Sequence, residues 1–114
     1  MDGLTKTFTE SKKMTDMTVA NEILRQLGGI RFILMTGARY FVASDDKTLS
    51  FQIPRSNGIQ GVSIKLNGMD TYDIEFCKLS KKEPYRIVIA TANDIYFDVL
   101  QEVFTRYTGL ATSL

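Results

Sequence analysis

The chain has 114 residues, of which 44% are hydrophobic and 24% charged, with a formal net charge of +1. This length and composition predict one packed globular domain and exclude a disordered or membrane-spanning chain. A net charge this close to zero excludes strong overall attraction to nucleic acid or anionic lipid, and leaves room only for a local basic patch.

Two residue types that carry much of enzyme chemistry are scarce. Histidine is absent and Cys77 is the single cysteine. The first absence removes the commonest general base and metal ligand, and one cysteine permits neither an internal disulfide nor a cysteine-based zinc site. Because the chain also lacks an apolar run of about 20 residues and a signal-peptide-like start, we expect a cytoplasmic protein with no membrane partner.

The N-terminal part of the chain predicts a flexible tail followed by a helix. Residues 1–14 are rich in Thr, Ser, Lys and Glu and cannot bury enough apolar surface to become ordered. We therefore expect a flexible tail over 1–14 and a single α+β domain over 15–114. From Thr18 onward apolar residues recur at helical spacing, and Gly28 is suited to end that helix.

A change of periodicity after this helix predicts the first strands. The apolar run at 31–35 is typical of a buried strand, and residues 36–38 form a break. The β-branched and aromatic residues at 40–43 favour another strand. Residues 31–43 therefore form either one bent strand or a hairpin. Strict alternation predicts a half-buried strand over 49–53.

A proline and a loop are predicted to follow that strand. Pro54 ends it, because proline cannot donate a hydrogen bond to a strand ladder. Residues 55–61 contain an Asn-Gly pair and a further glycine, and they predict a loop.

The clearest hairpin spans residues 62–66 and 72–76. All six of its alternating apolar residues have even numbers. If both strands bury the same face, opposed residues must have an even sum. This rule predicts a loop of three or five residues around Gly68, with the last apolar residue of the first strand facing the first of the second. It also places Lys65 opposite Asp73, as a cross-strand ion pair.

The C-terminal part predicts a turn, a strand and the strongest helix. Residues 80–84 form the turn and residues 85–90 the last strand. An apolar stripe at helical spacing follows, with Asn93 or Asp94 as the expected N-cap and Gly109 as the stop.

The order of these elements predicts the architecture. Short connections favour antiparallel neighbours, and two amphipathic helices need a shared apolar surface to cover. We expect an α+β two-layer sandwich, in which a mainly antiparallel sheet of five to six strands carries the N-terminal and C-terminal helices on one face. The other face of the sheet then stays open.

No residue pattern indicates catalysis. Cys77 fits a small residue on a strand, and Asp73 with Glu75 fits a solvated strand face more closely than a catalytic carboxylate pair. The glycine-containing segments match no phosphate-binding motif. We therefore predict a chain that is not an enzyme, with no catalytic residue, cofactor or metal site.

A set of basic and aromatic residues forms the only candidate for nucleic-acid binding. If the set shares the open face, its cations would contact phosphates and its tyrosine would stack on a base. The carboxylates of Asp73 and Glu75 on the same surface oppose this interpretation. The candidate residues are Arg39, Lys65, Lys78, Tyr85 and Arg86.

Three segments carry a resemblance to a known family. They are residues 21–38, which include Asn-Glu-Ile-Leu-Arg-Gln-Leu-Gly-Gly-Ile-Arg-Phe, residues 66–76 and residues 100–110. Together they resemble a family of small uncharacterised proteins carried by tailed phages, prophages and other mobile elements. The resemblance implies an accessory protein of such an element. It carries no activity, cofactor or site residue over to this chain.

These observations favour a binding module without enzymatic activity. We expect it to act on a host or phage protein, or by self-association as a homo-oligomer, through its open sheet face or a sheet edge. The alternative is a nucleic-acid-binding accessory protein that uses the open face.

Overall fold

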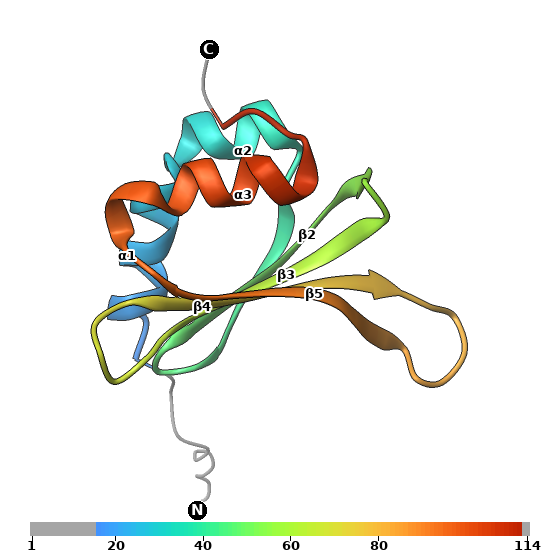
Figure 1. Ribbon diagram of the computed structural model, residues 1–114, viewed down its shortest axis with the longest axis horizontal. Coiled ribbons are helices and arrows are strands. Elements are labelled where there is room, and N and C mark those ends of the chain that lie inside the picture. The colour runs from blue at the N-terminus through green and yellow to red at the C-terminus, as the bar shows by residue number, and fades with distance from the viewer. Residues whose placement is uncertain (1–15, 113–114) are drawn as a thin grey trace, which may run out of the picture.

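The computed structural model describes residues 16–112, so the tail expected over 1–14 lies outside the described residues. It has an α+β fold, in which a five-stranded antiparallel sheet is joined by helices at both ends of the chain (Figure 1). This confirms the predicted fold class. The elements are α1 (Thr18–Leu27), α2 (Ile30–Thr36), β1 (Arg39–Asp45), β2 (Thr48–Ser56), β3 (Ile59–Leu66), β4 (Tyr72–Leu79), β5 (Arg86–Ile95), the 3-10 turn η1 (Phe97–Val99) and α3 (Leu100–Thr108).

The strands follow one another across the sheet in the order β1-β2-β3-β4-β5. The β3–β4 hairpin has the predicted register, with Leu66 opposite Tyr72 and Lys65 opposite Asp73, and the longer of the two predicted loops connects the strands. The register follows from burial, because a slip by one residue would turn every apolar side chain of a strand to the wrong face.

The prediction of a strand over residues 31–35 is wrong, because this segment is helix α2. Phe32 and Thr36 are buried while Leu34 between them is 78% exposed, which is the spacing of a helix and not of a strand. The helix ends at Gly37, whose φ of 75° lies in the left-handed region. Residues 31–43 are therefore a helix followed by β1, and neither one bent strand nor a hairpin.

The boundary between the last strand and the last helix also differs from the prediction. Asn93 and Asp94 do not cap a helix; they lie in β5, which continues to Ile95 because it pairs there with Tyr72 of β4. The capping preference of Asn and Asp is thus overridden by the sheet ladder. Gly109, with φ of 77°, ends α3 as predicted.

The segment around Pro54 is strand where a loop is predicted. β2 runs through Pro54 to Ser56, and only Asn57 and Gly58 form the turn to β3. The register between β2 and β3 is interrupted between Gln52 and Ser56, so the proline occupies an irregular part of the ladder. An interrupted ladder tolerates proline because no backbone donor is required there.

The core lies between one face of the sheet and the helices (Figure 1). Phe32 of α2 meets Phe51 of β2 and Phe104 of α3 edge to face, at ring-centroid distances of 5.5 and 5.1 Å. On β4, Phe76 stacks on Tyr107 of α3 at 4.5 Å. No helix within residues 16–112 lies on the opposite side of the sheet, which we call the uncovered face.

Candidate functional site

Polar side chains dominate the uncovered face. They alternate along each strand with the buried apolar residues, and strand pairing sets them in rows across the sheet. One row joins Ser50, Ser63, Glu75 and Thr91, and the next joins Thr48, Lys65 and Asp73.

Three hydroxyl groups and one guanidinium group connect four strands on this face. Ser44 Oγ lies 3.2 Å from Ser50 Oγ, which lies 2.8 Å from Ser63 Oγ. The Arg86 guanidinium donates to Ser63 Oγ at 2.6 Å. Gly61 leaves room for this reach, because a Cβ at position 61 would lie 3.1 Å from Arg86 Nη1, which is a tight contact. Arg86 is therefore held across the sheet instead of standing free in solvent.

The middle of the uncovered face contains a hollow of about 350 Å³. Asp73 Oδ1 accepts hydrogen bonds from the side-chain amide of Asn67 and the backbone N–H of Asp94, both at 3.1 Å. Within residues 16–112 no ion pair joins Asp73 to Lys65, although the two are opposite as predicted. The hollow is lined by Thr48, Ser63, Lys65, Asp73, Ile74, Glu75, Thr91 and Asn93.

The chemistry available on this face is limited. Cys77 is fully buried, and burial raises the pKa of its thiol above the usual value, so the thiol stays protonated and is a poor nucleophile. Among the residues that the structure describes, no group of three metal-ligating side chains comes together. The uncovered face therefore offers hydrogen bonds and charges for recognition.

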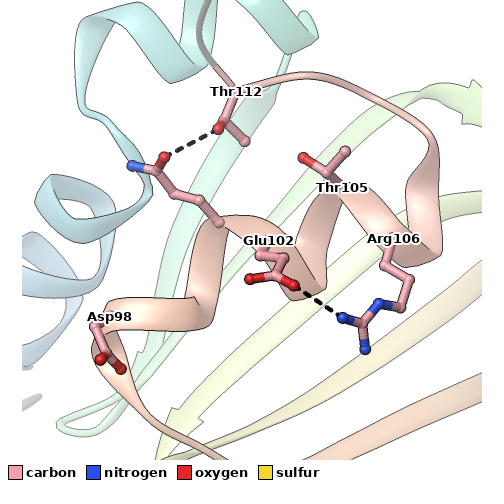
Figure 2. A pocket seen from close by; sticks show the side chains of 6 residues that line it. Asp98, Glu102, Thr105, Arg106 and Thr112 are labelled. Atoms are coloured by element: carbon pink, nitrogen blue, oxygen red, sulfur yellow. Dashed lines mark hydrogen bonds and ion pairs between the residues drawn. The ribbon is translucent and has the colours of Figure 1, made fainter.

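A second hollow, of about 560 Å³, follows the outer side of α3 (Figure 2). Several of its polar groups have partners within the chain. The Arg106 guanidinium donates to Glu102 at 3.0 Å, and Thr112 Oγ1 donates to the Gln101 side chain at 3.2 Å. The first contact lies within α3, and the second ties the segment after α3 back onto the helix.

The β4–β5 hairpin extends past the helices and forms a projecting arm, residues 78–89 (Figure 1). Every residue from 81 to 89 is exposed. The exposed side chains include Tyr85 at 59%, Val88 at 47% and Ile89 at 45%. Ile87 is exposed as well, so a run of branched apolar residues faces solvent on β5, an edge strand of the sheet.

The structure brings some of the five predicted nucleic-acid residues to the uncovered face. Lys65 lies in the central hollow, and Arg86 reaches into the same face to contact Ser63. Arg39 pairs with Gln52 at the far edge, on β1, and its guanidinium lies 5.4 Å from the ring centre of Tyr40.

The other two lie elsewhere. Lys78 follows Cys77 along β4 and therefore points to the opposite side of the sheet. Tyr85 lies on the arm, directly before β5. The exposed run at 87–89 escapes sequence reasoning, which treats residues 85–90 as an ordinary strand. One feature of the sequence could have indicated this exposure: these residues belong to the last predicted strand, and in a sheet whose strands follow chain order the last strand lies at an edge.

Comparisons of the chain with protein-family models, with curated proteins and with solved structures found no match. In the part of the chain that the structure describes, no helix has the length and apolar character needed to cross a membrane.

Proposed function

We propose that this protein is a non-enzymatic binding module that engages a protein partner through the free edge of β5 and its arm. The observation that carries the proposal is the exposed apolar run Ile87, Val88 and Ile89 on an edge strand. An edge strand presents unpaired backbone N–H and C=O groups, and adding a strand from a partner satisfies them while burying the apolar side chains.

The two edges of the sheet differ in their exposed apolar residues, which favours β5: three consecutive branched residues are exposed on β5, whereas β1 exposes Tyr40 and Val42. The pairing of β1 with β2 is interrupted at two places within seven residues, and Tyr40 has a φ of 58°. The pairing of β5 with β4 is interrupted at two places as well, between Val88 and Ala90 and between Ala92 and Ile95, and Asp94 has a φ of 57°. Irregularities of this kind twist an edge strand away from incoming strands, so they do not distinguish the two edges. The first three residues of β5 pair in regular register with β4, and nothing in the described residues covers their outer side.

The resemblance of three segments to proteins of phages and other mobile elements suggests the setting. We propose an accessory protein of such an element, whose partner is a protein of the phage or of its host. The polar hollow of the uncovered face, which adjoins the inner side of β5, then contributes specificity at the margin of the contact.

Nucleic-acid binding is the second candidate, supported by Arg39, Lys65 and Arg86 on the uncovered face. Asp73 and Glu75 oppose it, because they line the same central hollow as Lys65 and repel phosphate. Direct phosphate contacts would strengthen as salt is lowered. A titration of single- and double-stranded DNA and RNA at low salt should therefore show only weak, sequence-independent binding.

Site-specific photo-crosslinking in bacterial cells tests the main proposal. One variant carries the photoreactive residue in place of Ile89, and the matched control carries it in place of Val42, which is 55% exposed on the other edge strand. We expect discrete protein adducts at the first position and none at the second. Equal adducts at both positions, or none at either, would overturn the proposal, and adducts with nucleic acid would favour the second candidate.

A further inference from the structure

We infer that the partner at the β5 edge is an extended protein segment in which acidic residues adjoin a short apolar stretch. This inference rests on the proposed function and names the chemistry of the partner. Two independent features carry it. One is the direction of the free backbone groups in residues 86–88, and the other is the positive charge of the arm that adjoins them.

The backbone of residues 86–88 is arranged to receive another strand. The Ser80 N–H donates to the Tyr85 carbonyl at 2.9 Å, so the backbone groups of Tyr85 point toward β4. In an antiparallel pair the groups of successive residues point alternately toward the paired strand and away from it. The N–H and C=O groups of Arg86 and Val88 therefore point outward, in a stretch where the register with β4 is regular. A segment in extended conformation satisfies these groups, which explains why the partner is a strand.

The side chains of this stretch favour an apolar partner segment. Ile87 and Val88 are both exposed, and successive residues of a strand point to opposite faces of the sheet. An added strand would therefore meet a branched apolar side chain on each face of the arm. Burial of these side chains against the partner's own apolar residues stabilises the pairing. Phosphate groups offer no such contact, so this stretch favours a protein segment over nucleic acid.

The positive charge of the arm favours acidic residues next to that apolar stretch. Residues 78–89 contain four cations and one anion, although the net charge of the whole chain is only +1, so the rest of the chain is net negative. Arg86 is already engaged by Ser63, and the cations that remain free to meet a partner lie elsewhere on the arm. Lys81 and Lys82 are exposed, and within residues 16–112 no ion pair involves them.

The position of these two lysines fixes where the acidic residues lie. Lys81 and Lys82 belong to the tip of the arm, which extends past the helices just beyond the start of β5 at Arg86 (Figure 1). A strand that runs along the outer edge of β5 and continues past Arg86 passes the tip. Acidic residues at that end of the partner are attracted by the two ammonium groups, whereas basic residues are repelled.

Selection from a random library of displayed linear peptides tests the inference. The parent protein and the double variant Lys81→Glu with Lys82→Glu are used side by side. Peptides recovered on the parent should combine branched apolar residues with adjoining acidic residues, and those recovered on the double variant should lose the acidic excess. The matched control, Arg31→Glu with Lys47→Glu, makes the same change of charge at exposed positions away from the arm. It should recover the same acidic peptides as the parent.

Fluorescence anisotropy of the peptide most enriched on the parent measures the size of each effect. Lys81→Glu with Lys82→Glu should weaken binding at least about tenfold at low salt and less at high salt, since exposed charges are screened. The control pair should change the affinity less than about twofold. Val88→Lys should abolish binding, because it places an ammonium group where apolar side chains would be buried. Unchanged circular dichroism of all variants excludes unfolding.

The outcomes separate this inference from the proposed function. If the Ile89 position forms adducts with proteins while selection on the parent recovers no acidic excess, the inference is wrong and the proposed function stands. If an acidic peptide binds Val88→Lys as tightly as the parent, the lysines act without the β5 edge and the inference is wrong. If single-stranded DNA binds the parent more tightly than the selected peptide at the same salt concentration, the inference is wrong and the second candidate function is favoured.

Discussion

Replacing Phe32 with alanine should separate α2 from the rest of the core, whereas the same change at Leu34 should have almost no effect. Phe32 is fully buried and Leu34 is 78% exposed, although only one residue lies between them. In a strand these positions would share one face, and in a helix they lie on different faces. The pair of variants therefore tests whether residues 30–36 form a helix, which is where the sequence is most misleading.

The size of each effect follows from burial and contacts. A fully buried phenylalanine replaced by alanine costs about 3–5 kcal/mol of unfolding free energy. Part of this loss comes from two edge-to-face ring pairs, with Phe51 at 5.5 Å and Phe104 at 5.1 Å, each worth about 0.5–1.5 kcal/mol. Leu34 buries roughly a fifth of its surface, so its replacement costs at most about 0.5 kcal/mol.

Urea unfolding followed by far-ultraviolet circular dichroism measures both variants. Phe32→Ala should shift the transition midpoint to much lower urea, because a domain of this size has only about 5–15 kcal/mol of stability. The slope of the transition should change little, because it depends on the surface exposed on unfolding. Leu34→Ala should overlay the parent curve. Similar losses in the two variants would refute the helix and restore the strand that the apolar run suggests.

Other predictions concern the thiol, the end of α2 and the pH dependence of stability. Cys77 should react with a thiol reagent in the native protein far more slowly than in urea, and rapid native labelling would contradict its burial. Because the pKa of this thiol is raised in the folded state, unfolding free energy should fall as pH rises above about 8.5, where only the unfolded thiol ionises. Cys77→Ala should show a flatter alkaline profile, measured by thermal unfolding, and an equal decline in both proteins would argue against the raised pKa. Gly37→Ala should lose about 1–2 kcal/mol or more, since Gly37 has a φ of 75° and an added Cβ would lie 3.0 Å from Pro54 Cγ. Gly68→Ala is its control, because nothing lies within 4 Å of the added Cβ and φ is not left-handed; equal losses would contradict the geometry.

The elements predicted correctly from the sequence are those in which the spacing of apolar residues determines which face is buried. In the β3–β4 hairpin the alternation of residues 62–66 and 72–76 permits only one register, because any slip exposes the whole apolar set. The same reasoning identifies α1 and its stop at Gly28, where φ is 128°. Local pattern and tertiary burial agree in these segments.

The errors occur where local pattern and tertiary packing disagree. The apolar run of α2 is too short for periodicity to separate helix from strand. Asn93 and Asp94 have the chemistry of helix caps, yet β4 offers a ladder that extends β5 to Ile95. In both segments the outcome depends on a partner that is distant in the sequence, so no local pattern contains it.

The candidate site is the least predictable part of the molecule. The residue types of the uncovered face follow from alternation, as Lys65 and Arg86 illustrate, whereas Lys78 lies on the other side. The exposure of residues 87–89 depends on how far the helices reach along the sheet, and that distance is a property of the assembled fold. The sequence pattern of an apolar strand is the same whether a helix covers the strand or it faces solvent.

Amide hydrogen exchange along β5, resolved residue by residue and measured on the isotope-labelled chain alone and in bacterial lysate, tests the account most directly. Binding at the edge predicts that the outward amides of residues 86–88, where the register with β4 is regular, become protected in the lysate, and that Val88→Lys abolishes this protection. Amides of β1 should exchange equally in both samples. Fast exchange of the outward amides of residues 86–88 in the lysate would contradict the account.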